Sequence, residues 1–214
     1  MKKALVIAVA LMCAHGAFAQ GTVNFVNNVT GVFRSLIYDA NPASPAVQQK
    51  GQSAADTPAG STVYGGSLLA GTGWTVQLWW ADGTVTDANS LSLATTATSV
   101  FRTGGAAGIW TGTTAVLPGQ PGGAGTHVTA EVRVWDNKGG TILDWASAKQ
   151  QQASGLHMGT SGLFGIDNIG GGTATTPNLV NLQSFSLVSV PEPSTIALGI
   201  AGGLGLLFLR RRNK

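Results

Sequence analysis

The chain has few groups suited to covalent cross-linking or thiol-based metal binding. It contains one cysteine, Cys13, which lies in an apolar N-terminal segment that we expect to be removed. Without a thiol in the rest of the chain, disulfides, Cys-ligated zinc, iron–sulfur clusters and cysteine catalysis are excluded. The fold must therefore depend on its hydrophobic core.

Charge is also scarce, because Asp, Glu, Lys and Arg together make up 10% of the chain. Half of the twelve Lys and Arg residues lie in the two terminal segments, so the middle of the chain is slightly acidic, with six basic residues against eight acidic ones. A nucleic-acid partner normally requires a clustered basic face, and the middle has none. We therefore expect no nucleic acid among the partners.

Glutamate is nearly absent from the middle, where Glu131 is the only one. A glycosidase commonly needs two carboxyl groups, and Glu131 lies beside Arg133 on an expected strand, so we predict a solvent-facing cross-strand ion pair. His127 and His157 do not have the spacing of metal ligands. No Gly-x-Ser-x-Gly elbow occurs, although a non-contiguous Ser–His–Asp triad stays open. We expect no enzymatic activity, no metal and no cofactor.

The first nineteen residues have the pattern of a secretion signal. Two lysines precede an uncharged apolar run at 4–14, and Ala17 and Ala19 supply the small residues that signal peptidase reads. A buried N-terminal helix or a retained anchor is the alternative, but the run is too short to span ~30 Å of hydrocarbon. We predict a signal peptide at 1–19 and a mature chain that begins at Gln20.

The middle, residues 20–189, shows alternation with a period of two, which is typical of half-buried strands. Residues 74–80 place Trp74, Val76, Leu78 and Trp80 on one face, and residues 127–135 place four apolar side chains on one face. Gly, Thr and Ser are abundant, a composition that favours strands and turns over helices. Further strands are expected at 22–27, 33–38, 62–64, 100–103, 110–117 and 182–190.

Three other segments break or redirect this pattern. Asp82-Gly83 predicts a tight hairpin directly after residue 80, and the Pro-, Ala- and Gln-containing segment 41–58 predicts a long loop. Residues 143–153 contain good helix formers, with Asp144 as an N-cap and Gly155 as a terminator. The whole pattern predicts an all-β domain, an antiparallel sandwich or jelly roll with one short helix.

All six tryptophans lie in this middle domain. Most should belong to the core, because large aromatic residues dominate burial in β-sandwiches. Trp79 and Trp135, however, fall on the faces opposite the apolar rows. If their rings are exposed, they can stack on sugars, so they are the candidate sugar-binding residues.

The last 25 residues have a second, distinct organisation. Val190-Pro191-Glu192-Pro193-Ser194 precedes an apolar run at 196–209, which is followed by Arg210, Arg211 and Arg212. The prolines favour an extended backbone, and the apolar run predicts a short transmembrane helix. The arginines should stop translocation and stay cytoplasmic. The middle domain would then lie outside the inner membrane.

This arrangement closely resembles the PEP-CTERM sorting signal of Gram-negative bacteria. The resemblance implies that Pro191, Glu192 and Pro193 are recognised by an exosortase, a membrane protease that cleaves near the motif. It also implies a final location at the cell surface or in an exopolysaccharide matrix. An ordinary permanent membrane anchor is the alternative. The middle is similar to β-rich ectodomains found with such tails, which implies no particular activity.

The sequence thus predicts an exported structural protein of the surface or exopolysaccharide, processed by signal peptidase and exosortase. It would be anchored in the inner membrane before processing. A carbohydrate-binding module that uses an exposed aromatic face is the main alternative, with exopolysaccharide as the partner. An enzyme is the third alternative.

Overall fold

The computed structural model describes residues 20–190. The predicted signal peptide, Pro-Glu-Pro motif, transmembrane helix and arginine cluster lie outside that range. Within residues 20–190, no helix is long and apolar enough to cross a membrane.

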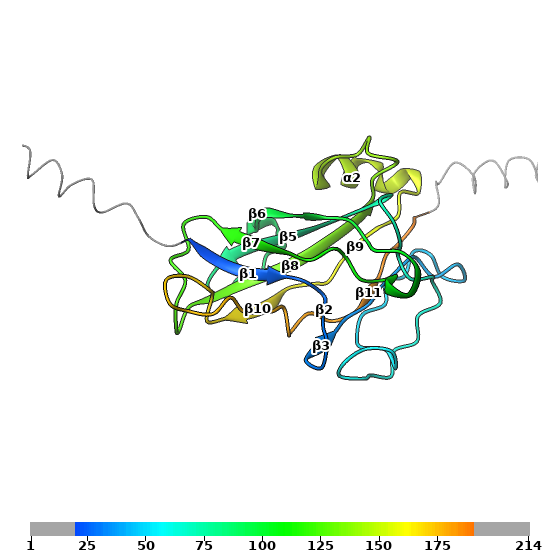
Figure 1. Cartoon of the computed structure of the whole chain (residues 1–214). Coiled ribbons are helices and arrows are strands. Elements are labelled where there is room, and N and C mark those ends of the chain that lie inside the picture. Colours follow the sequence, from blue (N-terminus) through cyan, green and yellow to red (C-terminus); the bar gives the residue numbers. More distant parts are fainter. Residues whose placement is uncertain (1–19, 191–214) are drawn as a thin grey trace, which may run out of the picture.

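The described part of the chain is built mainly from strands, as predicted, around an antiparallel sheet of seven strands (Figure 1). The sheet has the order β1-β7-β6-β5-β8-β10, and β9 pairs with β8. Its strands are β1 (Gly21–Phe25), β5 (Trp74–Asp82), β6 (Ser92–Ser99), β7 (Thr113–Leu117), β8 (His127–Asp136), β9 (Met158–Thr160) and β10 (Phe164–Asp167).

Shorter elements complete the structure. Two small sheets pair β2 (Asn28–Val29) with β3 (Phe33–Arg34), and β4 (Ile37–Tyr38) with β11 (Phe185–Ser186). The single α-helix within residues 20–190, α2 (Trp145–Gln151), packs against one face of β8. Three 3₁₀ turns lie at η2 (Ala88–Ser90), η3 (Gly104–Ala106) and η4 (Gln152–Ser154).

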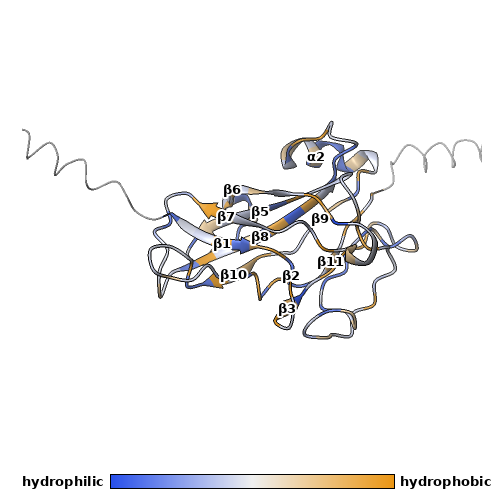
Figure 2. Cartoon of the chain, in the orientation of Figure 1, coloured by the Kyte–Doolittle hydropathy of each residue, from blue (hydrophilic) through white to orange (hydrophobic). Residues whose placement is uncertain are grey.

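Strands β5 and β8 form the centre of the sheet and pair along their whole length, from Trp74 opposite Asp136 to Asp82 opposite Val128. Alternation along β8 is visible as changing colours in Figure 2. One face of this pair enters the main hydrophobic core, as the period-two pattern predicts. That core also contains side chains from β1, β7 and the segment 179–187.

The short helix predicted at 143–153 is confirmed, with bounds two residues shorter at each end. Asp144 is its N-cap, because its carboxylate accepts a hydrogen bond from the backbone N–H of Ser147 at 2.8 Å. These hydrogen bonds from Ser147 also lower the pKa of Asp144. Gly155 ends the following 3₁₀ turn in the left-handed conformation, with φ of 77°.

The predicted tight hairpin at Asp82-Gly83 is wrong. Strand β5 reaches Asp82, and the N–H of Gly83 still donates to the carbonyl of His127 at 3.0 Å, so the chain continues along β8. The next strand begins only at Ser92, after a loop of residues 83–91, which we call the β5–β6 loop. Thr129 holds this loop: its hydroxyl donates to the carbonyl of Gly83 and accepts from the N–H of Val85.

Several weaker strand predictions are corrected in extent. Residues 62–64 form no strand, and residues 100–103 contribute only an isolated bridge between Phe101 and Trp110. Of residues 182–190, only β11 is a strand, with a further bridge from Val188 to Met158. The long loop predicted at 41–58 is present and makes only isolated bridges.

Candidate functional site

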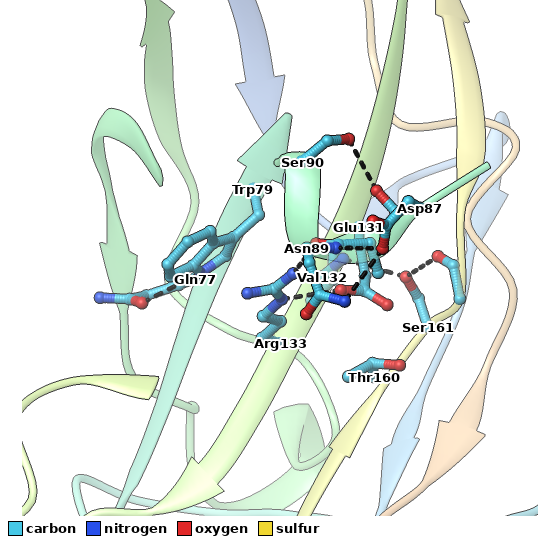
Figure 3. A network of polar contacts seen from close by, with 12 residues as sticks. Gln77, Trp79, Asp87, Asn89, Ser90, Glu131, Val132, Arg133, Thr160 and Ser161 are labelled. Atoms are coloured by element: carbon cyan, nitrogen blue, oxygen red, sulfur yellow. Dashed lines mark hydrogen bonds and ion pairs between the residues drawn. The ribbon is translucent and has the colours of Figure 1, made fainter. Parts of the chain in front are cut away.

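The sequence places Trp79 and Trp135 on the sheet face opposite the main core, and the structure agrees. In register, Thr75 lies opposite Trp135, Gln77 opposite Arg133, and Trp79 opposite Glu131. These side chains therefore form one row across β5 and β8, whose central part is drawn in Figure 3. The row is the candidate site that the sequence predicts.

Trp135 is not available for sugar stacking, contrary to the prediction. Helix α2 covers it, so the residue is wholly buried. Its indole N–H donates to the carbonyl of Ile142 at 3.0 Å, and its ring meets that of Trp145 edge-on at 5.9 Å. These contacts make Trp135 the centre of a second, smaller hydrophobic cluster beneath the helix.

Trp79 is half-buried, and a neighbouring cation approaches its ring. The guanidinium of Arg133 lies 4.1 Å from the centroid of the Trp79 ring and 5.5 Å from that of Trp145. The indole N–H of Trp79 donates to the side-chain carbonyl of Gln77 at 3.2 Å. This cation–π contact occupies part of the surface that a sugar would need for stacking.

Glu131 and Arg133 form the predicted ion pair, but it is buried rather than solvent-facing. Arg133 Nε donates to Glu131 Oε2 at 2.7 Å, and the two side chains are only 7% and 6% exposed. Both residues belong to β8, so the pair runs along one strand rather than across two. The second hydrogen bond of Arg133 goes from its terminal nitrogen to the carbonyl of Ala88 at 2.6 Å (Figure 3). The pair therefore ties the β5–β6 loop to the sheet.

Lys50 adds a second positive charge near Glu131. Burial lowers the pKa of Lys50, and the negative charge of Glu131 partly opposes that change. The one glutamate in residues 20–190 thus has a bonded cation and a second cation nearby. Through its bond to Arg133, Glu131 helps to hold β8 and the β5–β6 loop together.

The two histidines in the described chain lie at opposite ends of β8. His127 begins the strand and contacts Asp167 at 2.6 Å. His157 contacts Asp39 at 2.6 Å, beside the strand's other end, where its carbonyl accepts from the N–H of Asp136. Nine residue steps along a strand span roughly 30 Å, so the histidines cannot share a site. Within residues 20–190 no group of three His, Cys, Asp or Glu side chains is placed to hold a metal ion.

No pattern in the sequence indicated a tyrosine pair that joins the long loops to the β4–β11 sheet. The rings of Tyr38 and Tyr64 stack with centroids 4.0 Å apart and planes 4° from parallel. The Tyr64 hydroxyl lies within hydrogen-bonding distance of two carbonyls, at 2.6 Å from Gly51 and 2.7 Å from Ser184. Burial, followed by the nearby charges of Asp56 and Tyr38, raises the pKa of Tyr64 well above its usual value.

The raised pKa of Tyr64 predicts that the domain loses stability at alkaline pH. The raised pKa of Tyr64 means that its stabilising contribution is fully present below about pH 10, the pKa of an unfolded tyrosine, and is lost as the pH rises further. We expect the melting temperature of the wild type to fall above about pH 10. Tyr64→Phe should lose about 1 kcal/mol at neutral pH, from the hydrogen bond, yet show a shallower alkaline slope.

Thermal melts between neutral pH and about pH 11 check this prediction. Since the chain has only two tyrosines, phenolate absorbance of the variant reports Tyr38 alone. Parallel slopes for wild type and variant would show that Tyr64 is not responsible.

The final described segment is hydrogen-bonded to the rest of the domain as far as Ser189, shortly before the predicted Pro-Glu-Pro motif. The N–H of Ser189 donates to the carbonyl of Pro45 at 2.7 Å, and its hydroxyl donates to the carbonyl of Gly155 at 3.1 Å. This end of the chain lies beside the α2 side of the sheet, drawn in orange in Figure 1. The residues predicted for processing (Ala17, Ala19, Pro191, Glu192, Pro193, Arg210, Arg211, Arg212) lie outside the described range.

Comparison with protein families, curated proteins and solved structures finds no match to this chain.

Proposed function

We propose that the chain is an exported structural protein of the cell surface or exopolysaccharide, sorted by its Pro-Glu-Pro tail. The observation that carries this proposal is the order of the parts along the chain. A secretion signal precedes a β-rich domain whose hydrogen bonding continues to Ser189, and the motif starts at Pro191. The motif thus begins two residues after Ser189, as expected of a processing signal that follows the domain.

We infer further that the domain is a β-sandwich in the broad sense. The support is the single large core between the β5–β8 face and the segments that lie across it. Those segments contribute Leu179, Leu182 and Phe185 from the C-terminal part of the domain, while Val23 and Phe25 come from β1, the end strand of the same sheet. An aliphatic and aromatic core of this kind stabilises a domain that has no disulfide.

A non-catalytic role is supported by the state of the titratable side chains. Glu131 is neutralised by Arg133 in a buried pair. Each histidine contacts its own aspartate, at a different end of β8. Such pairs are typical of groups that organise a framework. We propose that membrane anchoring is temporary and that signal peptidase and exosortase are the processing partners.

Glu192→Ala tests the sorting proposal. The change lies outside the described domain, so the melting temperature should stay that of the wild type. Membrane insertion should also persist, because the apolar run and the arginines are unchanged. Recognition of the motif should fail, however, and the full-length protein should accumulate in the inner membrane.

Cell fractionation combined with intact mass measures both the location and the two chain ends. Asn213→Ala, a neutral change beyond the arginines, is the matched control and should be processed normally. If Glu192→Ala reaches the surface as efficiently as the control, the motif is only a linker and the sorting proposal fails.

A further inference from the structure

A cleft of about 430 Å³ lies at the end of β5 that is farthest from α2. Its volume falls in the range of small-molecule sites, roughly 300–1,000 Å³. Trp80 and Asp82 line it from β5, Ser92 and Leu93 from the start of β6, and Ser90 from the end of the β5–β6 loop. Pro118, directly after β7, completes the wall. Leu93 pairs with Trp79 in the register of β5 and β6, so the cleft borders the Trp79–Arg133 row, but neither Trp79 nor Arg133 lines it.

Trp80 lines this cleft and also carries an unpaired hydrogen-bond donor. The residue is 8% exposed, and its indole N–H has no hydrogen-bond partner in the described part of the chain. Most buried polar groups in native proteins are paired, so an unpaired one needs a physical explanation. That nitrogen has almost no accessible surface, so it lies behind the cleft wall and a ligand in the cleft does not reach it.

The other polar groups of the cleft are mainly acceptors. Gln120 donates to Asp82 Oδ1 at 2.6 Å, which fixes the carboxylate and leaves Oδ2 facing outward without a partner among residues 20–190. The Ser90 hydroxyl donates to the carbonyl of Asp87 at 2.7 Å, so its oxygen lone pairs are free. Ser92 is exposed and its hydroxyl makes no hydrogen bond within the described chain.

Apolar surface lies beside these polar groups. Leu93 is 41% exposed although it lies on a strand, and Pro118 is exposed at the cleft wall. An aliphatic wall next to a carboxylate and hydroxyls matches a ligand with a C–H face and several hydroxyl groups. The single negative charge disfavours an acidic ligand such as a phosphate or a uronic acid.

We propose that this cleft binds one neutral hexose unit of a polysaccharide. The sugar hydroxyls donate to Asp82 Oδ2 and to the serine oxygens. The C–H face of the ring rests on Leu93 and Pro118. The inference gives the domain a ligand-binding site and does not depend on the processing of the tail.

The test uses the full-length chain in a detergent without a sugar headgroup. Tryptophan fluorescence and calorimetry are followed while the soluble neutral polysaccharides dextran, mannan and galactan are added in separate titrations, with alginate as the acidic comparison. We expect saturable binding to at least one neutral polymer and none to alginate. Absence of binding to all three neutral polymers would overturn the proposal, and so would a preference for alginate.

Two variants locate the site. Asp82→Asn keeps the acceptor for Gln120 but removes the charge, and should weaken binding roughly tenfold or more, since hydrogen bonds to charged groups are the stronger ones. Ser92→Ala should weaken it several-fold. Thr86→Ala, an exposed change in the same loop but outside the cleft, should have no effect.

Far-UV circular dichroism and melting temperature show whether each variant is folded. If Asp82→Asn does not fold, Ser92→Ala still tests the site. If binding survives both cleft changes but is lost in Trp79→Ala, the sugar lies on the Trp79–Arg133 row and the proposal is overturned. Surface delivery, measured by fractionation, should be the same for all cleft variants. Failure of sugar binding is thereby distinguishable from failure of the sorting proposal.

Discussion

Replacing Glu131 with leucine should lower the free energy of unfolding by about 3–5 kcal/mol, the usual cost of removing one partner of a buried ion pair. The change leaves the guanidinium of Arg133 more than nine-tenths buried with no anionic partner on its strand. Its remaining contacts, the Ala88 carbonyl and two indole rings, do not neutralise its charge. Urea denaturation of the purified protein measures the loss.

The double variant Glu131→Leu/Arg133→Met separates pairing from packing. When both charges are replaced by apolar groups of similar volume, the cost of a buried unpaired charge disappears. The double variant should therefore be clearly more stable than Glu131→Leu alone. Lys138→Met removes a more exposed pair, with Asp136 at 3.0 Å, and should cost less than about 1 kcal/mol. If Glu131→Leu is no more destabilising than this control, the pair does not stabilise the domain.

Arg133 also connects the two candidate sites of the domain. Its hydrogen bond to Ala88 holds the β5–β6 loop, and that loop delivers Ser90 to the cleft beside Trp80. The double variant loses this hydrogen bond even though it recovers stability. Faster proteolysis within residues 83–91 is consequently expected in the double variant, together with weaker sugar binding.

The sequence predicted the central strands because both alternate strictly along their length. In β5 and β8 every second residue enters the main core, so the period of two survives in the residue pattern. The N-cap of α2 could also be predicted, since the Asp144 carboxylate accepts local hydrogen bonds from Ser147. Features determined within a few residues along the chain could therefore be found without the structure.

Strand β6 escaped prediction for a physical reason. Its buried residues are Ala94 and Ala97, a spacing of three that does not resemble a strand. Thr96 between them has φ of 57°, and the register with β5 shifts between Gln77 and Trp79. A bulge of this kind inserts a residue and breaks the alternation.

The sequence also could not show what covers the face of β5 and β8 that lies opposite the main core. Alternation shows which side chains share a face, but not whether water, a helix or a loop covers the other one. Trp135 and Trp79 lie on the same face, yet α2 buries only the first completely. The cleft at Trp80 could not be predicted from the sequence either, because β5, β6 and the residue after β7 meet only in the folded chain.

A contribution to stability that no sequence pattern indicated comes from Asn27, which is fully buried just after β1. Its side-chain amide donates to the carbonyls of Ser35 and Gly108, both at 2.8 Å. Its side-chain carbonyl accepts from the N–H of Trp110 at 3.2 Å. One side chain thus pairs backbone groups from two segments that are far apart in the sequence.

Asn27→Ala should lower the free energy of unfolding by about 2–6 kcal/mol, because the Ser35 carbonyl and the Trp110 N–H lose their partner in a buried site and each unpaired group costs about 1–3 kcal/mol. The Gly108 carbonyl keeps a hydrogen bond from the N–H of Ile37 at 3.2 Å. Asn27→Asp should be at least as damaging, since it keeps the acceptor but sets a carboxylate against two carbonyls. Asn181→Ala removes one hydrogen bond, to Gly165 at 2.9 Å, from an exposed side chain and should cost less than about 1 kcal/mol. Urea denaturation of the three variants beside wild type decides the matter: if Asn27→Ala unfolds at the same midpoint as Asn181→Ala, these hydrogen bonds do not secure the segments around β1.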